Sequence, residues 1–288
     1  MRMLAATCVA FGLLVSGPVA RAQNAPPPSS AAAFEAASVK EHLAPGDGSF
    51  VGRRPGGRFA AENATLREII EYAYEIQSHQ LIGSLAPIAS ARWDVTATLG
   101  GAAGQGGPDA ILPAVRTLLA DRFGLVARRE TRTLQVYALR PARADGTPGP
   151  NLTTSALDCR ALIAAARSGG GPPPEAARQC GFRGRVGSLQ STGMPLTELA
   201  LALSGRVGRA VLDQTGLAGP WDLTLTYAPD SAQIPAGTLA PDAPRPAGNP
   251  DAPSLAAALQ EQLGLRLVST TAPVDVLVVD RVSRPTPD

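Results

Sequence analysis

The feature that most constrains the fold of this chain is an internal repeat of sequence motifs. Three motifs recur in the same order, and their copies lie 130, 128 and 140 residues apart. Chance readily produces one such match, but three in one order indicate that a single structural unit occurs twice. The matched segments are 65–69 with 195–199, 93–98 with 221–226, and 121–125 with 261–265.

Each copy contains two apolar stripes with the spacing of one buried helix face. Thr65 and Glu68 form a capping box at the start of the first helix, and in the second copy Pro195 replaces the capping threonine. Gly124 and Gly264 follow the second stripe, where a left-handed residue ends a helix. The stripes are Leu66, Ile69, Ile70 and Ala73; Val115, Leu118, Leu119 and Phe123; Leu196, Leu199, Ala200 and Leu203; and Leu255, Ala258, Leu259 and Leu263.

Alternating apolar and polar residues predict strands between and after these helices. A Trp-Asp pair opens one strand in each copy, and we interpret Trp93 and Trp221 as structural anchors of the two cores. Two further strands are expected to close each copy. These closing strands are 125–130 with 134–140, and 265–269 with 274–281; strands at 34–40 and 58–62 should open the first copy, and the second opens less clearly around 182–191.

The expected fold class is therefore α+β, with a duplicated βαββαββ-like unit, mixed sheets and helices packed on one face. The units are expected at 34–141 and 181–284, with a long Pro/Ala loop at 228–253 inside the second. The segment 142–180 between them is interpreted as a linker that carries two cysteines. The pattern leaves open whether the units share one sheet or form separate domains.

The N-terminus has the features of a secretory signal peptide at 1–22. Arg2 is followed by an apolar run, and Ala20-Arg21-Ala22 is a small-x-small site that predicts cleavage after Ala22. Residues 23–33 are expected to form a disordered tether. An uncleaved anchor is the alternative, and no later segment has the roughly 20 apolar residues of a membrane helix. The expected location is the periplasm or the extracellular medium.

Export determines how Cys159 and Cys180 are interpreted. In an oxidising compartment, an even pair of cysteines in a loop-rich segment is most simply a disulfide, with free thiols as the alternative. A metal site would need further ligands, and the two histidines, His42 and His79, are distant in sequence. We therefore predict no metal and no cofactor.

The sequence contains no recognisable catalytic constellation. It has neither the G-x-S-x-G elbow of a serine hydrolase nor the H-E-x-x-H motif of a zinc hydrolase. His42 and His79 fit solvent-exposed positions better than the position of a catalytic base. Glu68 and Glu71 could act as an acid and a base, but their spacing does not force them together. An enzyme is therefore not the favoured interpretation.

The charge balance argues against nucleic acid as a partner. The chain has 26 Lys and Arg against 24 Asp and Glu, a formal net charge of +2. Several arginines, including Arg128 and Arg132, could form a basic face on the first unit. No aromatic side chains are interleaved with them, as nucleic-acid binding would favour.

Several motifs resemble those of a known family. FEAASVK lies at 34–40, GRF at 57–59 with NATLR at 63–67, LADRFGL at 119–125 with ET at 130–131, and DQTGL at 213–217 with Gly219 and Trp221-Asp222. Over residues 34–284 they resemble the soil-associated exported bacterial protein family of unknown function, a resemblance that implies no activity and no catalytic residues. A second likeness, at the level of fold, is to the short periplasmic N-terminal domains of secretins and TonB-dependent receptors, which bind proteins.

The leading hypothesis for function is an exported, non-enzymatic module that binds a protein, peptide or other ligand of the cell envelope or medium. Its mode of binding would be a groove or an exposed strand edge. The alternative is a secreted hydrolase whose acidic residues meet only in the folded chain. A third possibility is a sensor ectodomain that works beside a membrane protein, although no membrane helix is predicted in this chain.

Overall fold

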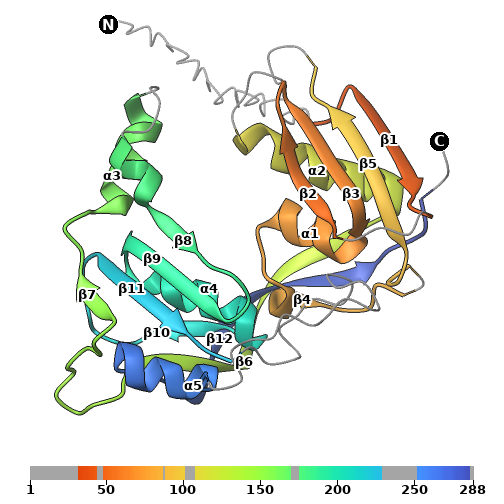
Figure 1. Ribbon diagram of the computed structural model, residues 1–288. Coiled ribbons are helices and arrows are strands. Elements are labelled where there is room, and N and C mark those ends of the chain that lie inside the picture. The colour runs from red at the N-terminus through yellow and green to blue at the C-terminus, as the bar shows by residue number, and fades with distance from the viewer. Residues whose placement is uncertain are drawn as a thin grey trace, which may run out of the picture. The chain divides into compact units, whose positions relative to one another are not determined.

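The computed structural model describes residues 32–43, 48–86, 88–100, 108–169, 175–228 and 252–285 (Figure 1). The residues Ala32–Asp288 belong to one compact unit. The predicted signal peptide with its cleavage site after Ala22, residues 23–31 of the predicted tether and most of the loop 228–253 lie outside the described residues. Among the helices that are described, none is long and apolar enough to cross a membrane. The predicted α+β class is confirmed, since helices and three four-stranded sheets are present.

The first lobe is an antiparallel sheet in the order β1-β5-β3-β2, with two helices on one face (Figure 1). Side chains from the sheet and both helices form its core, including Phe59, Ile70, Trp93 and Phe123. The strands are β1 (Ala36–Glu41), β2 (Phe50–Arg54), β3 (Arg58–Thr65) and β5 (Arg92–Thr98); the helices are α1 (Leu66–Tyr74) and α2 (Pro108–Phe123), and the short elements η1 (Ser78–Gln80) and β4 (Leu81–Ile82) follow α1.

The second lobe has a sheet with the matching order β7-β11-β9-β8, also antiparallel. Its core includes Leu199, Trp221, Leu225 and Leu259. The strands are β7 (Leu152–Thr154), β8 (Gly181–Arg183), β9 (Ser188–Met194) and β11 (Trp221–Thr226); the helices are α3 (Cys159–Gly169), α4 (Leu196–Val207) and α5 (Leu255–Ala258); the shorter elements are η3 (Glu175–Gln179), the π-helical turn η5 (Leu259–Leu263) and β10 (Val211–Asp213).

Local signals in the sequence fix the ends of the helices. Thr65 and Glu68 form the capping box at the start of α1, with the Thr65 N–H donating to Glu68 Oε2 at 2.6 Å. Pro195 precedes α4 without a side-chain cap. Gly124 follows α2 with a φ angle of 56°, and Gly264 follows η5 with a φ angle of 67°. Both glycines therefore adopt the left-handed conformation that ends a helix and that other residues avoid.

The two pairs of closing strands were predicted wrongly. Each pair is one continuous strand, β6 (Val126–Pro141, 16 residues) and β12 (Leu265–Arg281, 17 residues). Between the expected halves of β6 lie Thr131, Arg132 and Thr133, which contain no turn-forming residue. Pro273 interrupts the pattern of β12, but β4 pairs with this strand only at Leu277 and Val278, so the proline lies where β12 has one strand neighbour. A proline is tolerated at such an edge.

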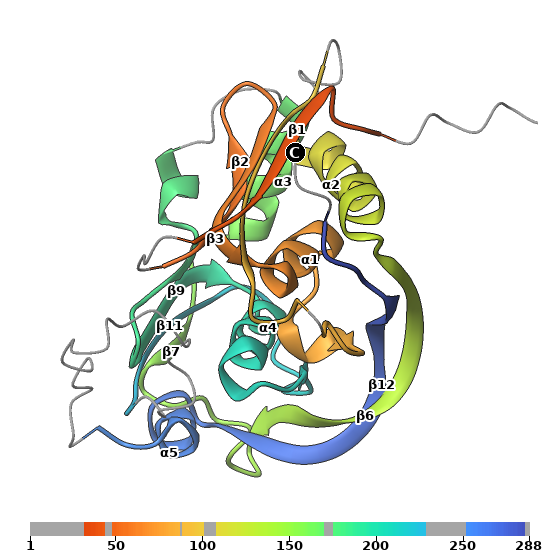
Figure 2. The ribbon, with the colours of Figure 1, turned by 90° about the vertical axis from the view of Figure 1, so that its right-hand side faces the viewer.

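These long strands join the lobes through a shared central sheet in the order β10-β6-β12-β4. β6 and β12 are antiparallel and pair from Leu265 with Pro141 to Arg281 with Val126. β4 and β10 each add one short parallel strand, so the sheet is mixed. Figure 2 shows the two long strands side by side, curving past α4. The question that the sequence left open is answered: the two halves of the chain share a sheet.

The shared strands also exchange core residues. Leu277 and Val279 of β12 are 1% and 6% exposed and belong to the core of the first lobe. Leu139 of β6 is fully buried in the core of the second lobe. Val136 and Val276 belong to a third buried cluster on the central sheet. The core of the second lobe is therefore completed by β6, which follows the first lobe in the chain. The core of the first lobe is completed by β12, which follows the second lobe in the chain.

The predicted disulfide is present between Cys159 and Cys180, whose Cα atoms are 5.5 Å apart. It joins the start of α3 to the residue before β8 across a sequence separation of 21 residues. Closing a loop of this size stabilises a fold by about 3 kcal/mol through restriction of the unfolded chain. The bridge therefore holds a segment that otherwise has little core of its own.

We expect the two lobes to unfold together, because each core contains a strand of the shared ribbon. Trp93 and Trp221 are the two tryptophans and report on one lobe each, so the variants Trp93→Phe and Trp221→Phe isolate the two signals. In both backgrounds Leu139→Ala should lower the free energy of unfolding by about 2–5 kcal/mol, measured by fluorescence in urea. Leu201→Ala, at a side chain that is 53% exposed, serves as the control. A loss reported by Trp221 alone would contradict this coupling.

Candidate functional site

The repeated Trp-Asp pairs open β5 and β11. Trp93 is 3% exposed and Trp221 is 6% exposed, so both rings belong to the cores as expected of anchors. The following aspartates, Asp94 and Asp222, are only partly buried. Because strand residues alternate between faces, both carboxylates lie on the sheet face opposite the cores, which we call the outer face.

Each aspartate supports an irregularity in the neighbouring strand. The pairing of β3 with β5 shifts register between Ala61 and Ala64, and Asn63 there has a φ of 49°. Its N–H donates to Asp94 Oδ1 at 2.9 Å. In the second lobe Gly193 has a φ of 66°, and its N–H donates to Asp222 Oδ1, also at 2.9 Å. At each irregularity a backbone N–H loses its hydrogen-bond partner in the neighbouring strand. The aspartate carboxylate accepts this N–H instead.

In the first lobe this aspartate has a second partner that the sequence did not reveal. His42 Nδ1 lies 2.8 Å from Asp94 Oδ2 and 3.0 Å from Oδ1. The His42 side chain is 19% exposed, so the expectation of a solvent-exposed histidine was wrong. The two residues are 52 positions apart, and β1 brings them together by pairing Glu41 with Trp93.

The environment of Asp94 lowers the pKa of its carboxyl group. Partial burial alone would raise this pKa. The hydrogen bond from the Asn63 N–H, the hydrogen bond with His42 and the charge of His42 outweigh burial. The carboxylate is therefore ionised at neutral pH, as its two hydrogen bonds require.

In the second lobe the outer face around the equivalent aspartate is hollow. A polar pocket of about 280 Å³ opens beside Asp222, between β7, β9 and β11. Thr224 pairs with Gln190 across β11 and β9, and Asp222 pairs with Thr153 across β11 and β7. The lining residues are Pro150, Asn151, Thr153, Gln190, Ser191, Thr192, Asp222, Leu223 and Thr224.

The edge strand beside the hollow is shorter than its counterpart in the first lobe. β1 pairs with β5 along six residues, whereas β7 has three residues and pairs only with Trp221, Asp222 and Leu223. Past this point the N–H of Thr224 donates to the Asn151 carbonyl at 3.2 Å. The pocket therefore lies over the paired part of the sheet and reaches the residues just before β7, Pro150 and Asn151.

A side chain completes the exposed edge of β11. Gln262 Oε1 accepts the Thr226 N–H at 2.9 Å, and Gln262 Nε2 donates to the Thr226 carbonyl at 2.7 Å. The side-chain amide thus takes both hydrogen bonds that a neighbouring strand would make. This protects the edge from pairing with another chain.

A second pocket of about 220 Å³ lies in the first lobe, between the segment leading into β1 and α2. Its lining includes Phe34, Leu118, Asp121 and Arg122. Arg122 is committed to the fold, since its Nη2 donates to the Ala37 carbonyl at 3.3 Å. We regard this pocket as the weaker candidate, because its one basic group already holds the edge of β1.

The other residues that the sequence singled out are separate from both pockets. Glu68 is occupied by the capping box, and burial raises the pKa of Glu71 on the same helix. His79 lies in η1, where burial lowers its pKa. Across the described ranges, no group of three or more His, Cys, Asp or Glu residues is placed to hold a metal ion.

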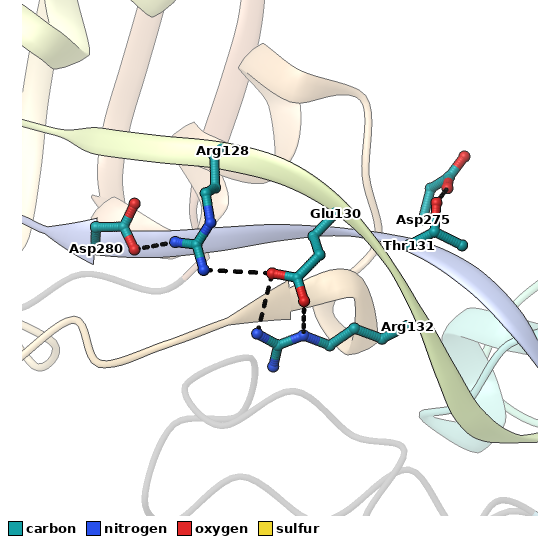
Figure 3. A network of polar contacts seen from close by, with 6 residues as sticks. All are labelled: Arg128, Glu130, Thr131, Arg132, Asp275 and Asp280. Atoms are coloured by element: carbon teal, nitrogen blue, oxygen red, sulfur yellow. Dashed lines mark hydrogen bonds and ion pairs between the residues drawn. The ribbon is translucent and has the colours of Figure 1, made fainter.

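The arginines of the expected basic face are paired along the long ribbon (Figure 3). Glu130 accepts from Arg132 Nε at 2.8 Å and from Arg128 Nη2 at 3.3 Å. Arg128 also pairs with Asp280 on β12, and the Thr131 hydroxyl donates to Asp275 at 2.6 Å. These exposed contacts each stabilise the fold only slightly, but they neutralise the arginines as a surface for anions.

The structure thus defines an α+β protein with two similarly ordered lobes, a shared sheet and a polar pocket beside Asp222. A family model described as "protein of unknown function (DUF3738)" matches residues 67–282, and the chain belongs to this family. No curated protein and no solved structure matched the chain. The predicted membership of a family of unknown function is therefore confirmed, whereas soil association and the likeness to secretin and TonB receptor domains stay predictions.

Acid should remove the stabilising effect of Asp94. Because folding lowers its pKa, the contribution of Asp94 is complete above the pKa of an unfolded aspartate, about 3.9, and is lost as the pH falls through the lower folded pKa. Asp94→Asn, which keeps an oxygen for the Asn63 N–H, should therefore be less stable than wild type at pH 7 and equal to it in strong acid. Urea unfolding at a series of pH values measures this difference. For Thr96→Val, which removes no titratable group, the difference should not follow this pattern.

Proposed function

We propose that this protein is an exported, non-enzymatic binding module, and that its ligand site is the polar pocket on the outer face of the second lobe. The observation that carries the proposal is the hollow of about 280 Å³ beside Asp222, lined mainly by hydroxyl and amide side chains. A concave site with a few converging polar groups is the usual form of a ligand site. At this size it suits a small ligand or the end of a peptide.

The comparison between the lobes supports this choice of site. In the first lobe β1 runs along the whole of β5, and His42 binds the aspartate. In the second lobe a pocket lies beside the equivalent aspartate. We propose that both lobes derive from duplication of one unit, which the sequence placed at 34–141 and 181–284. The second copy also takes its edge strand β7 from the segment 142–180, which the sequence analysis interpreted as a linker. The equal strand order and the repeated Trp-Asp motif support this origin.

A hydrolase is the alternative function, and the two pockets give it little support. Each is lined by one carboxylate, Asp121 in one and Asp222 in the other. Hydrolysis of a glycosidic bond by paired carboxyl groups needs two of them about 5–10 Å apart. The enzyme hypothesis therefore stays a prediction without a site.

Export is part of the proposal and has a direct test. The disulfide between Cys159 and Cys180 suits an oxidising compartment. The protein recovered from a secreting host should have an intact mass that begins at Gln23, and its thiols should react with an alkylating reagent only after reduction. A chain that retains residues 1–22, or that is alkylated without reduction, would contradict export.

Filling the pocket should abolish binding. Thr224 is exposed and lines the hollow, so Thr224→Trp should weaken a bound ligand by more than about tenfold through steric overlap. The equivalent exposed position in the first lobe is Thr96, and Thr96→Trp is the matched control. A panel of sugars, amino acids and short peptides can be screened by backbone amide chemical shifts of the secreted protein. If no member binds, or if both variants bind equally well, the proposed function is wrong.

A further inference from the structure

The pocket contains one charged group, and none of the described basic side chains forms an ion pair with it. Among the described residues that line it, Asp222 is the one ionisable side chain. No described Lys, Arg or His lies within ion-pair distance of its carboxylate, whereas Glu62 and Asp94 pair with Arg54 and His42. A carboxylate in a pocket of neutral groups attracts a cation.

The geometry of this carboxylate restricts the kind of cation. Asp222 Oδ1 accepts the Gly193 N–H at 2.9 Å, so one oxygen is already engaged and the orientation of the group is fixed. A guanidinium binds a carboxylate best through two parallel hydrogen bonds to both oxygens. An ammonium group needs only one oxygen of the carboxylate and directs its remaining donors elsewhere. A guanidinium would have to share Oδ1 with the Gly193 N–H, whereas an ammonium group can bind Oδ2 alone, so we take an ammonium group as the better match.

The neighbouring groups suit an ammonium better than a metal ion. Calcium takes six to eight oxygen ligands, usually with several carboxylates among them, whereas this pocket supplies one carboxylate. The hydroxyl groups of Thr153, Thr192 and Thr224 and the side-chain amide oxygens of Asn151 and Gln190 can accept the other ammonium protons. The same groups can bind hydroxyls or amides in the rest of the ligand.

We infer that the pocket selects small polar ligands that carry a primary ammonium group, which pairs with Asp222 while the threonine and amide side chains bind the uncharged remainder. This inference rests on the proposed function of the pocket as a ligand site. Two sources supply such a group, an amino sugar and the N-terminus of a short peptide. Both are compatible with a hollow of about 280 Å³.

Two matched pairs of probes test the inference on the secreted protein. Glucosamine is compared with N-acetylglucosamine, and alanyl-alanine amide with its N-acetyl derivative, so that each pair differs in the charged amine. The readout is the chemical-shift change of the backbone amides of Thr192 and Gly193. We expect at least one cationic probe to shift these amides, and its acetylated partner to bind about tenfold more weakly, the effect of losing a hydrogen bond between charged groups. The cationic probe that binds identifies the source.

Asp222→Asn separates charge from structure, because asparagine keeps an oxygen for the Gly193 N–H. This variant should bind the cationic probe about tenfold more weakly, whereas Asp94→Asn, the equivalent change in the first lobe, should bind it as wild type does. Equal binding of acetylated and cationic probes at these amides would overturn the inference and leave the pocket function standing. If neither cationic probe shifts these amides in large excess, the inference is also overturned, and the Thr224→Trp comparison then judges the pocket separately.

Discussion

The antiparallel pairing of β6 with β12 is the interaction on which the rest of the structure depends. It runs along 16 residues of β6 and joins segments from opposite halves of the chain. β10 pairs with the outer edge of β6, and β4 pairs with the outer edge of β12. Leu139 of β6 packs in the core of the second lobe, and Leu277 and Val279 of β12 pack in the core of the first lobe. The four-stranded sheets of the lobes can position their outer faces only because this ribbon closes the cores behind them.

Features that depend on neighbours within a few residues could be predicted from the sequence. Features that depend on contacts between distant segments could not. The capping box at Thr65, the glycines after the second helices and the apolar stripes all depend on neighbours within a few residues, and each was readable. The long strands were divided in two because the pattern of one strand does not show its partner. Pairing of Thr133 with Pro273 holds β6 and β12 extended through the region where a turn was expected.

The candidate site shows the same division. The repeated Trp-Asp motif was visible, and its interpretation as an anchor describes what the tryptophans do. The pocket, however, is lined by residues of three separate segments, 150–153, 190–192 and 222–224, which only the folded sheet brings together. His42 likewise meets Asp94 across 52 positions. The two aspartates have equal backbone roles and different surroundings, and only the folded chain distinguishes them.

The exchange of long strands also sets the order in which the chain can fold. Leu277 and Val279, which complete the core of the first lobe, belong to β12, the last strand of the described chain. During synthesis the first lobe therefore cannot complete its core until β12 has been made. Pairings of such large sequence separation form slowly, because they carry a large loop-closure entropy. The first lobe therefore reaches its full stability only after β12 has paired with β6.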